Sequence, residues 1–169
     1  NLEIGYCAKT MEVHLRCVGN ANALSQADSI VRDSLPHQLV SNDLKLIEEV
    51  VIELLKAKGQ WITFAESCTG GLLAHRLTNV SGASSVLAEA HVTYANDVKT
   101  RLLGVNSKSV EAHGVVSSEV VTQMAEGALK VSGADHALAI TGIAGPTGGS
   151  AEKPVGTVYL GLASKDAET

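Results

Sequence analysis

Short apolar runs alternate with helical patterns along most of this chain, and this alternation limits the fold more than any other feature. The pattern begins near Leu44 and continues to Ala163. Strands are predicted at residues 61–65, 86–93, 137–141 and 155–163, and helices at 44–59, 72–77, 96–103 and 117–131. Interleaved strands and helices of these lengths are typical of layered domains. We therefore predict an α/β fold, with a mixed central sheet between two layers of helices.

A different pattern precedes this region. Apolar residues alternate with other residues over 2–17, which predicts a half-buried hairpin, with Met11 among its inward positions. A helical stripe follows over 25–35, and residues 36–43 form the expected linker, with Asn42 or Asp43 capping the next helix. A β-β-α piece of this size is too small to bury a core alone. We divide the chain into a segment over 1–40 and a domain over 41–169.

Composition excludes several classes of protein. Hydrophobic residues make up 45% of the chain, which argues against disorder, and the net charge of −5 argues against binding to nucleic acid. Three cysteines without a C-x-x-C pair, and six histidines without metal-ligand spacing, predict no disulfide framework, metal or cofactor. No signal peptide or apolar run of ~20 residues is present, so we expect a cytoplasmic fragment of a longer protein.

The first candidate motif is Ala65-Glu-Ser-Cys-Thr-Gly-Gly71, at the turn from a predicted buried strand into a helix. Small residues let the backbone turn sharply there, and a helix start offers N–H groups to a phosphate or an oxyanion. The structural alternative is an ordinary helix cap by Ser67 or Thr69. The motif is not the G-x-S-x-G elbow, because Ala65 replaces the first glycine.

The second motif is Thr93-Tyr-Ala-Asn-Asp-Val-Lys99, which follows the next predicted strand. With Asn96 as the N-cap, Lys99 falls in the first helical turn, where the helix dipole disfavours a positive charge. A lysine in that position could act as a base near neutral pH. The alternative is an ordinary solvated lysine on an exposed face.

The third motif is Thr141-Gly-Ile-Ala-Gly-Pro-Thr-Gly-Gly-Ser150, a glycine-rich loop after a strand. Its N–H groups could line an anion, although it lacks the Gly-Lys-Ser/Thr sequence of a P-loop. The alternative is a mobile hairpin without a ligand.

Together, these three motifs and the following Lys153-Pro-Val-Gly-Thr157 strongly resemble the CinA C-terminal domain family, from about Leu44 to Ala163. The resemblance implies an amidase that converts nicotinamide mononucleotide to nicotinate mononucleotide and ammonia, within pyridine-nucleotide (NAD) metabolism. Residues 2–18 resemble the end of the KH-like domain that precedes the amidase in full-length proteins. Members of the family usually continue with another strand and a final helix, which leaves open whether residues 41–169 lack these elements.

The resemblance also assigns roles to residues. Ser67 becomes the candidate nucleophile and Lys99 the candidate base, while Tyr94 shares the proton relay. The candidate substrate-binding residues come from the same motifs: Glu66, Cys68, Thr69, Gly70, Gly71, Thr141, Gly142, Gly145 and Gly148. Cys68 remains a rival nucleophile, because a thiol at a helix N-terminus is the more reactive group.

The competing class of function is a non-catalytic, nucleotide-binding regulatory module in which Ser67 only caps a helix. In either class the expected partner is a small-molecule nucleotide, with no nucleic acid and no membrane. An RNA-binding role for the β-β-α segment is disfavoured, because it lacks a G-x-x-G loop and is not basic. A homo-oligomer is compatible with the sequence.

Overall fold

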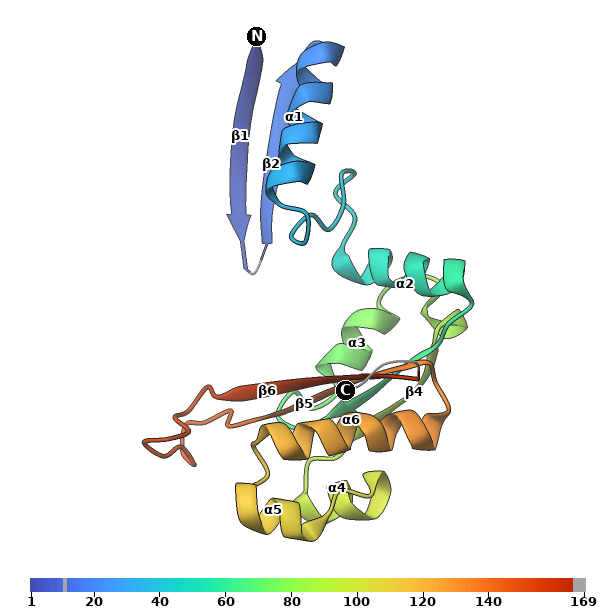
Figure 1. The fold of residues 1–169 in the computed structure, drawn as a ribbon, viewed down its shortest axis with the longest axis vertical. Coiled ribbons are helices and arrows are strands. Elements are labelled where there is room, and N and C mark those ends of the chain that lie inside the picture. The colour runs from blue at the N-terminus through green and yellow to red at the C-terminus, as the bar shows by residue number, and fades with distance from the viewer. Residues whose placement is uncertain (11, 166–169) are drawn as a thin grey trace. The chain divides into compact units, whose positions relative to one another are not determined.

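The computed structural model describes residues 1–10 and 12–165, and the chain divides into two compact units, Asn1–Val50 and Val51–Thr169. In the first unit, β1 (Leu2–Lys9) pairs antiparallel with β2 (Glu12–Gly19), and α1 (Ala21–Ser34) follows (Figure 1). The predicted hairpin and helix are therefore present, and Met11 lies outside the described residues. The hairpin is not half-buried as predicted, because β1 is exposed along its whole length and Val13 of β2 is 69% exposed. Ala27 is the sole buried residue among those described in this unit, so it has little core of its own.

Helix α2 (Ile47–Lys58) begins later than the sequence predicts. The expected cap at Asn42 or Asp43 is wrong, because Leu44 adopts a left-handed backbone with φ of 62° and interrupts the helical path. The carboxylate of Glu49 instead accepts the N–H of Leu46, just before the first turn. Gly59, with φ of 63°, follows the helix as predicted.

The second unit is built on a four-stranded sheet in the order β4-β3-β5-β6. Its strands are β3 (Ile62–Glu66), β4 (Leu87–Val92), β5 (His136–Gly142) and β6 (Val158–Ser164). Strand β3 is parallel to both β4 and β5, whereas β6 runs antiparallel to β5. The predicted mixed sheet is confirmed. Since β4, β3 and β5 are parallel, the segments that follow them begin at the same edge of the sheet.

Helices cover both faces of this sheet, as predicted (Figure 1). The remaining helices are α3 (Leu72–Thr78), the short 3₁₀ helix η1 (Ala83–Ser85), α4 (Asn96–Leu103), α5 (Ser107–His113) and α6 (Ser118–Ser132). Met124 of α6 packs against Ala65 and Ala139 on one face, whereas Ile52 of α2 packs with Phe64 on the other. Alternate residues of the central strands thus enter two separate cores, which gives an α/β/α arrangement.

The helix boundaries include one correction and one element that the sequence did not predict. Helix α4 has the predicted bounds, but its N-cap residue is Ala95 with an extended backbone, so Asn96 is the first helical residue rather than the cap. Helix α5 was not predicted, since its seven residues carry no clear apolar stripe. In the part of the chain that the structure describes, every helix is too short or too polar to span a bilayer.

Candidate active site

The three motifs meet around a cavity of about 300 Å³ at the edge where the parallel strands end. Main-chain hydrogen bonds hold the motifs together, because Ser67 N–H donates to Ile140 C=O and Thr93 N–H donates to Glu66 C=O. The cavity is lined by Ser67, Cys68, Tyr94, Asn96, Lys99, Val115, Val116, Thr141, Gly142, Ile143, Ala144, Gly145 and Thr147. Residues more than 70 positions apart in the sequence therefore share one site.

Ser67 and Lys99 are in direct contact at this site. Lys99 Nζ lies 3.1 Å from Ser67 Oγ, 2.7 Å from the carbonyl oxygen of Thr93 and 3.2 Å from that of Tyr94. Ser67 is buried at the turn between β3 and α3, and the first turn of α4 carries Lys99. A serine hydroxyl and a lysine amine at this distance can exchange a proton.

Burial determines the protonation chemistry of Lys99. The side chain is only 1% exposed, which excludes the alternative of a solvated lysine. Burial lowers the pKa of Lys99, because it disfavours the charged ammonium, while the nearby Cys68 acts weakly in the opposite direction. Among the described residues no ion pair to Lys99 is present. Burial is thus the leading cause of the lowered pKa of Lys99.

Glu66 organises the start of α3. Its fully buried carboxylate accepts the N–H groups of Gly71, Leu73 and Ala74 at 3.0–3.1 Å. These N–H groups are consequently not free for an anion, which corrects the expectation that the helix start as a whole offers unpaired donors. Gly71 is the N-cap residue and no side chain caps α3 in the usual position, so the ordinary capping role for Ser67 or Thr69 is also wrong.

Cys68, Thr69 and Gly70 follow Ser67 in the turn between β3 and α3. Burial raises the pKa of the Cys68 thiol and outweighs the N–H groups of Cys68 and Thr69, which act to lower that pKa. A raised pKa reduces the thiolate fraction, which weakens the case for Cys68 as the nucleophile. The Thr69 hydroxyl is buried without a hydrogen-bond partner among the described residues. Gly70 adopts φ of 61° and its N–H donates to Ser67 C=O, closing a tight turn.

Tyr94 and Thr141 both line the cavity, but they differ in exposure. The Tyr94 side chain is 68% exposed, and the group that contacts Lys99 is the Tyr94 carbonyl. Thr141 is buried, and its hydroxyl donates to Val115 C=O at 2.9 Å. Thr141 therefore joins the end of β5 to the connection between α5 and α6.

The glycine-rich loop connects β5 to β6. Ile143 N–H donates to Thr157 C=O and Gly156 N–H donates to Ile143 C=O, and these two hydrogen bonds close the base of the hairpin. Gly145 has φ of 77°, and a Cβ atom there would lie 2.5 Å from Val155. Gly148 also has a positive φ, of 92°. Ala144, Gly145 and Thr147 line the cavity, and within residues 1–10 and 12–165 their N–H groups have no hydrogen-bond acceptor.

Sequence reasoning did not find Val115 and Val116, which form one wall of the cavity. They follow α5, the helix that was not predicted, and no local pattern distinguishes them from other buried valines. Among the described residues no cluster of histidine, cysteine and acidic side chains could hold a metal ion. His136, one of the histidines interpreted as structural, contacts Ser164 Oγ and Gln60 Oε1.

Comparison with known proteins agrees with this architecture. The sequence model of the CinA C-terminal domain matches residues 44–169. The chain belongs to the CinA C-terminal domain family. The CinA domain from Agrobacterium tumefaciens, described as the competence/damage inducible protein CihA, is structurally similar with a TM-score of 0.70 and 46% identity, over 71% of this chain and 73% of that one. The competence damage-inducible protein A (ComA) from Klebsiella pneumoniae has a TM-score of 0.68 and 35% identity, over 71% of this chain and 74% of that one.

Two curated relatives in the CinA family differ in length. A CinA-like protein from Geobacter sp. strain M21 is 44% identical over 97% of this chain, which spans only 40% of that relative. An Enterobacter agglomerans protein named nicotinamide-nucleotide amidohydrolase PncC is 52% identical over 72% of this chain and 76% of its own length. The chain thus spans about 40% of the long CinA relatives and most of the short PncC protein.

Proposed function

We propose that this chain hydrolyses the carboxamide of nicotinamide mononucleotide to nicotinate mononucleotide and ammonia, a reaction of NAD metabolism. The observation that carries the proposal is the buried pair of Ser67 and Lys99, with 3.1 Å between Oγ and Nζ at the wall of the cavity. The name of the PncC relative supplies the substrate class, and the shared domain supports its transfer to this chain.

The contacts of Lys99 match those that a neutral amine can make. A neutral amine has two N–H donors and one lone pair. The carbonyl oxygens of Thr93 and Tyr94 can only accept, so they take the two N–H groups. In the structure Lys99 Nζ donates to Ser67 Oγ, and once the amine is neutral its lone pair is left for the same hydroxyl, which can then donate to it. The lysine is therefore ready to receive the serine proton, as an activated nucleophile requires.

The proposed reaction has two halves. Ser67 Oγ forms a bond to the carboxamide carbon as its proton passes to Lys99 Nζ, and the carbonyl oxygen becomes an oxyanion. Lys99 returns the proton to the amide nitrogen, the C–N bond breaks, and ammonia leaves an ester on Ser67. Water then attacks the ester carbon and gives a proton to Lys99, which protonates Ser67 Oγ as the acid departs. Tyr94, at the mouth of the cavity, is assigned to the same proton relay.

Two sets of N–H groups support substrate binding. The N–H groups of Cys68 and Thr69 directly follow Ser67 in the sequence and are assigned to the oxyanion, since Glu66 occupies those of the following helix. The unpaired N–H groups of Ala144, Gly145 and Thr147 are assigned to the substrate phosphate. Phosphate binding there would orient the carboxamide toward Ser67, at the opposite side of the cavity.

Ammonia release from nicotinamide mononucleotide by the purified chain tests the proposal. Wild type should release ammonia in proportion to nicotinate mononucleotide, and Ser67→Ala should remove nearly all turnover. Cys68→Ser is the matched control, because it changes the adjacent cavity residue and should keep substantial activity. Activity in Ser67→Ala together with an inactive Cys68→Ser would transfer the nucleophile to the thiol. Binding of the nucleotide without turnover in wild type would favour the regulatory module instead.

A further inference from the structure

Lys153 connects two walls of the cavity, although it does not line the cavity itself. It lies in the loop between β5 and β6, and its Nζ donates to His113 C=O at 2.7 Å and to Val116 C=O at 2.8 Å. These carbonyls belong to the end of α5 and to the α5–α6 connection, about 40 residues away in sequence. Val116 lines the same cavity as Ala144, Gly145 and Thr147 of the glycine-rich loop.

This contact is chemically suited to hold a loop. Both acceptors are main-chain carbonyls, and His113 is the last residue of α5, where the helix dipole favours a cation. Hydrogen bonds from a charged donor are stronger than neutral ones. Lys153 is also fixed at its own main chain, because its N–H donates to Ser150 Oγ and its C=O accepts Ser150 N–H. The side chain of Lys153 therefore anchors a turn whose own main chain is hydrogen-bonded.

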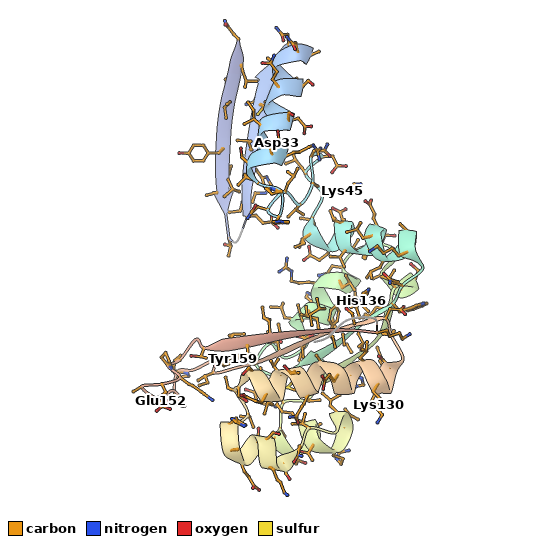
Figure 2. All side chains as sticks on the ribbon, viewed as in Figure 1. Asp33, Lys45, Lys130, His136, Glu152 and Tyr159 are labelled. Carbon is orange, nitrogen blue, oxygen red and sulfur yellow. The ribbon has the colours of Figure 1, made fainter. Side chains whose placement is uncertain are left out.

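The loop needs such an anchor because it projects beyond the sheet. Figure 2 shows Glu152, the residue before Lys153, at the far tip of this projection. Between β5 and β6 the arms are hydrogen-bonded at Ile143, Gly156 and Thr157 near the base. The cavity-lining N–H groups from Ala144 to Thr147 lie in the arm beyond that base. Thr141 holds the base to Val115, and Lys153 supplies the second attachment to the same connection.

We propose that Lys153 is a positioning residue that sets the width of the active-site cavity by tying the glycine-rich loop to the α5–α6 connection. Lys153 touches neither Ser67 nor Lys99, so its loss should leave the chemical groups in place. Loss of Lys153 should instead weaken the binding of the substrate phosphate by the loop. The kinetic part of this inference rests on the proposed function, whereas the cavity width can be measured without turnover.

The test uses Lys153→Met, which keeps the length of the side chain and removes its donors, and Lys153→Arg, which keeps a charged donor. Lys130→Met is the matched control, since Lys130 is exposed at the far end of α6 (Figure 2). All proteins also carry Cys7→Ser and Cys17→Ser, which leaves Cys68 in the cavity wall as the single thiol. Two quantities are measured: the rate of Cys68 alkylation by iodoacetamide, and kcat and KM for nicotinamide mononucleotide.

In Lys153→Met we expect Cys68 to be alkylated several-fold faster, and KM to rise by roughly tenfold, the loss that corresponds to one charge-assisted hydrogen bond. The value of kcat should stay near wild type, and Lys153→Arg should restore both quantities in part. An alkylation rate equal to that of Lys130→Met overturns the proposal, as does a lower kcat with unchanged KM. If Cys68 is alkylated faster in Lys153→Met but none of the proteins releases ammonia, the positioning role of Lys153 is supported and the proposed function is rejected.

If Lys153→Met does not fold, Lys153→Gln replaces it, because the amide can still donate to one of the two carbonyls. Cys68 should be alkylated faster in Lys153→Gln than in wild type, and the rate in Lys153→Arg should be closer to that of wild type. Identical rates in wild type, Lys153→Gln and Lys153→Arg would overturn the proposal.

Discussion

Replacing Gly127 with alanine should displace α4, the helix that carries Lys99, and so disturb the active site. Gly127 lies in α6, where α4 packs against it. A Cβ atom there would overlap the carbonyl oxygen of Leu103 and lie 2.8 Å from the carbonyl carbon. Leu103 is the last residue of α4, and Lys99 lies one helical turn before it. The absence of a side chain at Gly127 thus permits the position of the helix that carries the candidate base.

Two opposing effects determine the size of the change. Alanine is the better helix former and would stabilise α6 by about 1 kcal/mol. Overpacking costs about 1–3 kcal/mol, and the upper end applies here because a helix carbonyl cannot rotate away as a flexible side chain can. We therefore expect Gly127→Ala to lower the free energy of unfolding by ~2 kcal/mol.

The displacement of α4 should also reduce the rate of turnover. Restoring ordinary contact of ~3.5 Å to the Leu103 carbonyl oxygen requires α4 to retreat by roughly 1.5 Å. A shift of that size would take Lys99 Nζ from 3.1 Å to beyond hydrogen-bond distance of Ser67 Oγ. Misplacement of a reacting group by ~1 Å can lower turnover by roughly 100-fold.

Urea unfolding and ammonia release measure the two effects. Glu126→Ala is the control, because it alters the exposed neighbour on α6 and tests helix propensity alone. Wild-type turnover in a Gly127→Ala protein that is at least as stable as wild type would refute the reasoning, since it would show that the close approach of α4 and α6 does not position Lys99.

Four further predictions concern the site itself. Because burial lowers the pKa of Lys99, kcat/KM should rise with pH as the amine loses its proton, and Lys99→Arg should be inactive because arginine stays protonated; an active Lys99→Arg would exclude the role. At a pH between the two pKa values, Lys99 carries a proton in the unfolded chain but not in the folded one. The free energy of unfolding should therefore increase as pH rises toward the usual lysine pKa of 10.5. In Lys99→Met, the free energy of unfolding measured with urea should depend less on pH. Glu66→Gln places an amide donor against the N–H groups of α3, and we expect a loss of about 2 kcal/mol in urea unfolding; an unchanged midpoint would contradict this. Nicotinamide mononucleotide should have a much higher kcat/KM than nicotinamide riboside, and equal values would mean that the loop binds no phosphate.

Local sequence determined most of the secondary structure and the three motifs that line the cavity. Alternating apolar runs predicted the four strands of the sheet, and helical stripes predicted α3, α4 and α6 within a few residues. Ser67, Lys99 and the glycine-rich loop could be singled out because each follows a strand, and parallel strands end at one edge of a sheet. These features depend on neighbours within a few residues, which a sequence records directly.

Tertiary contacts decided what those residues do. Lys99 looks like a surface lysine in sequence, and it becomes a buried base candidate because α4 packs against α6 and turns its amine toward Ser67. Glu66 looks like a substrate ligand, yet the folded chain places α3 over its carboxylate. Lys153 reaches carbonyls about 40 residues away. No local pattern encodes such pairings, because a buried group takes its environment from segments that only the packed fold brings beside it.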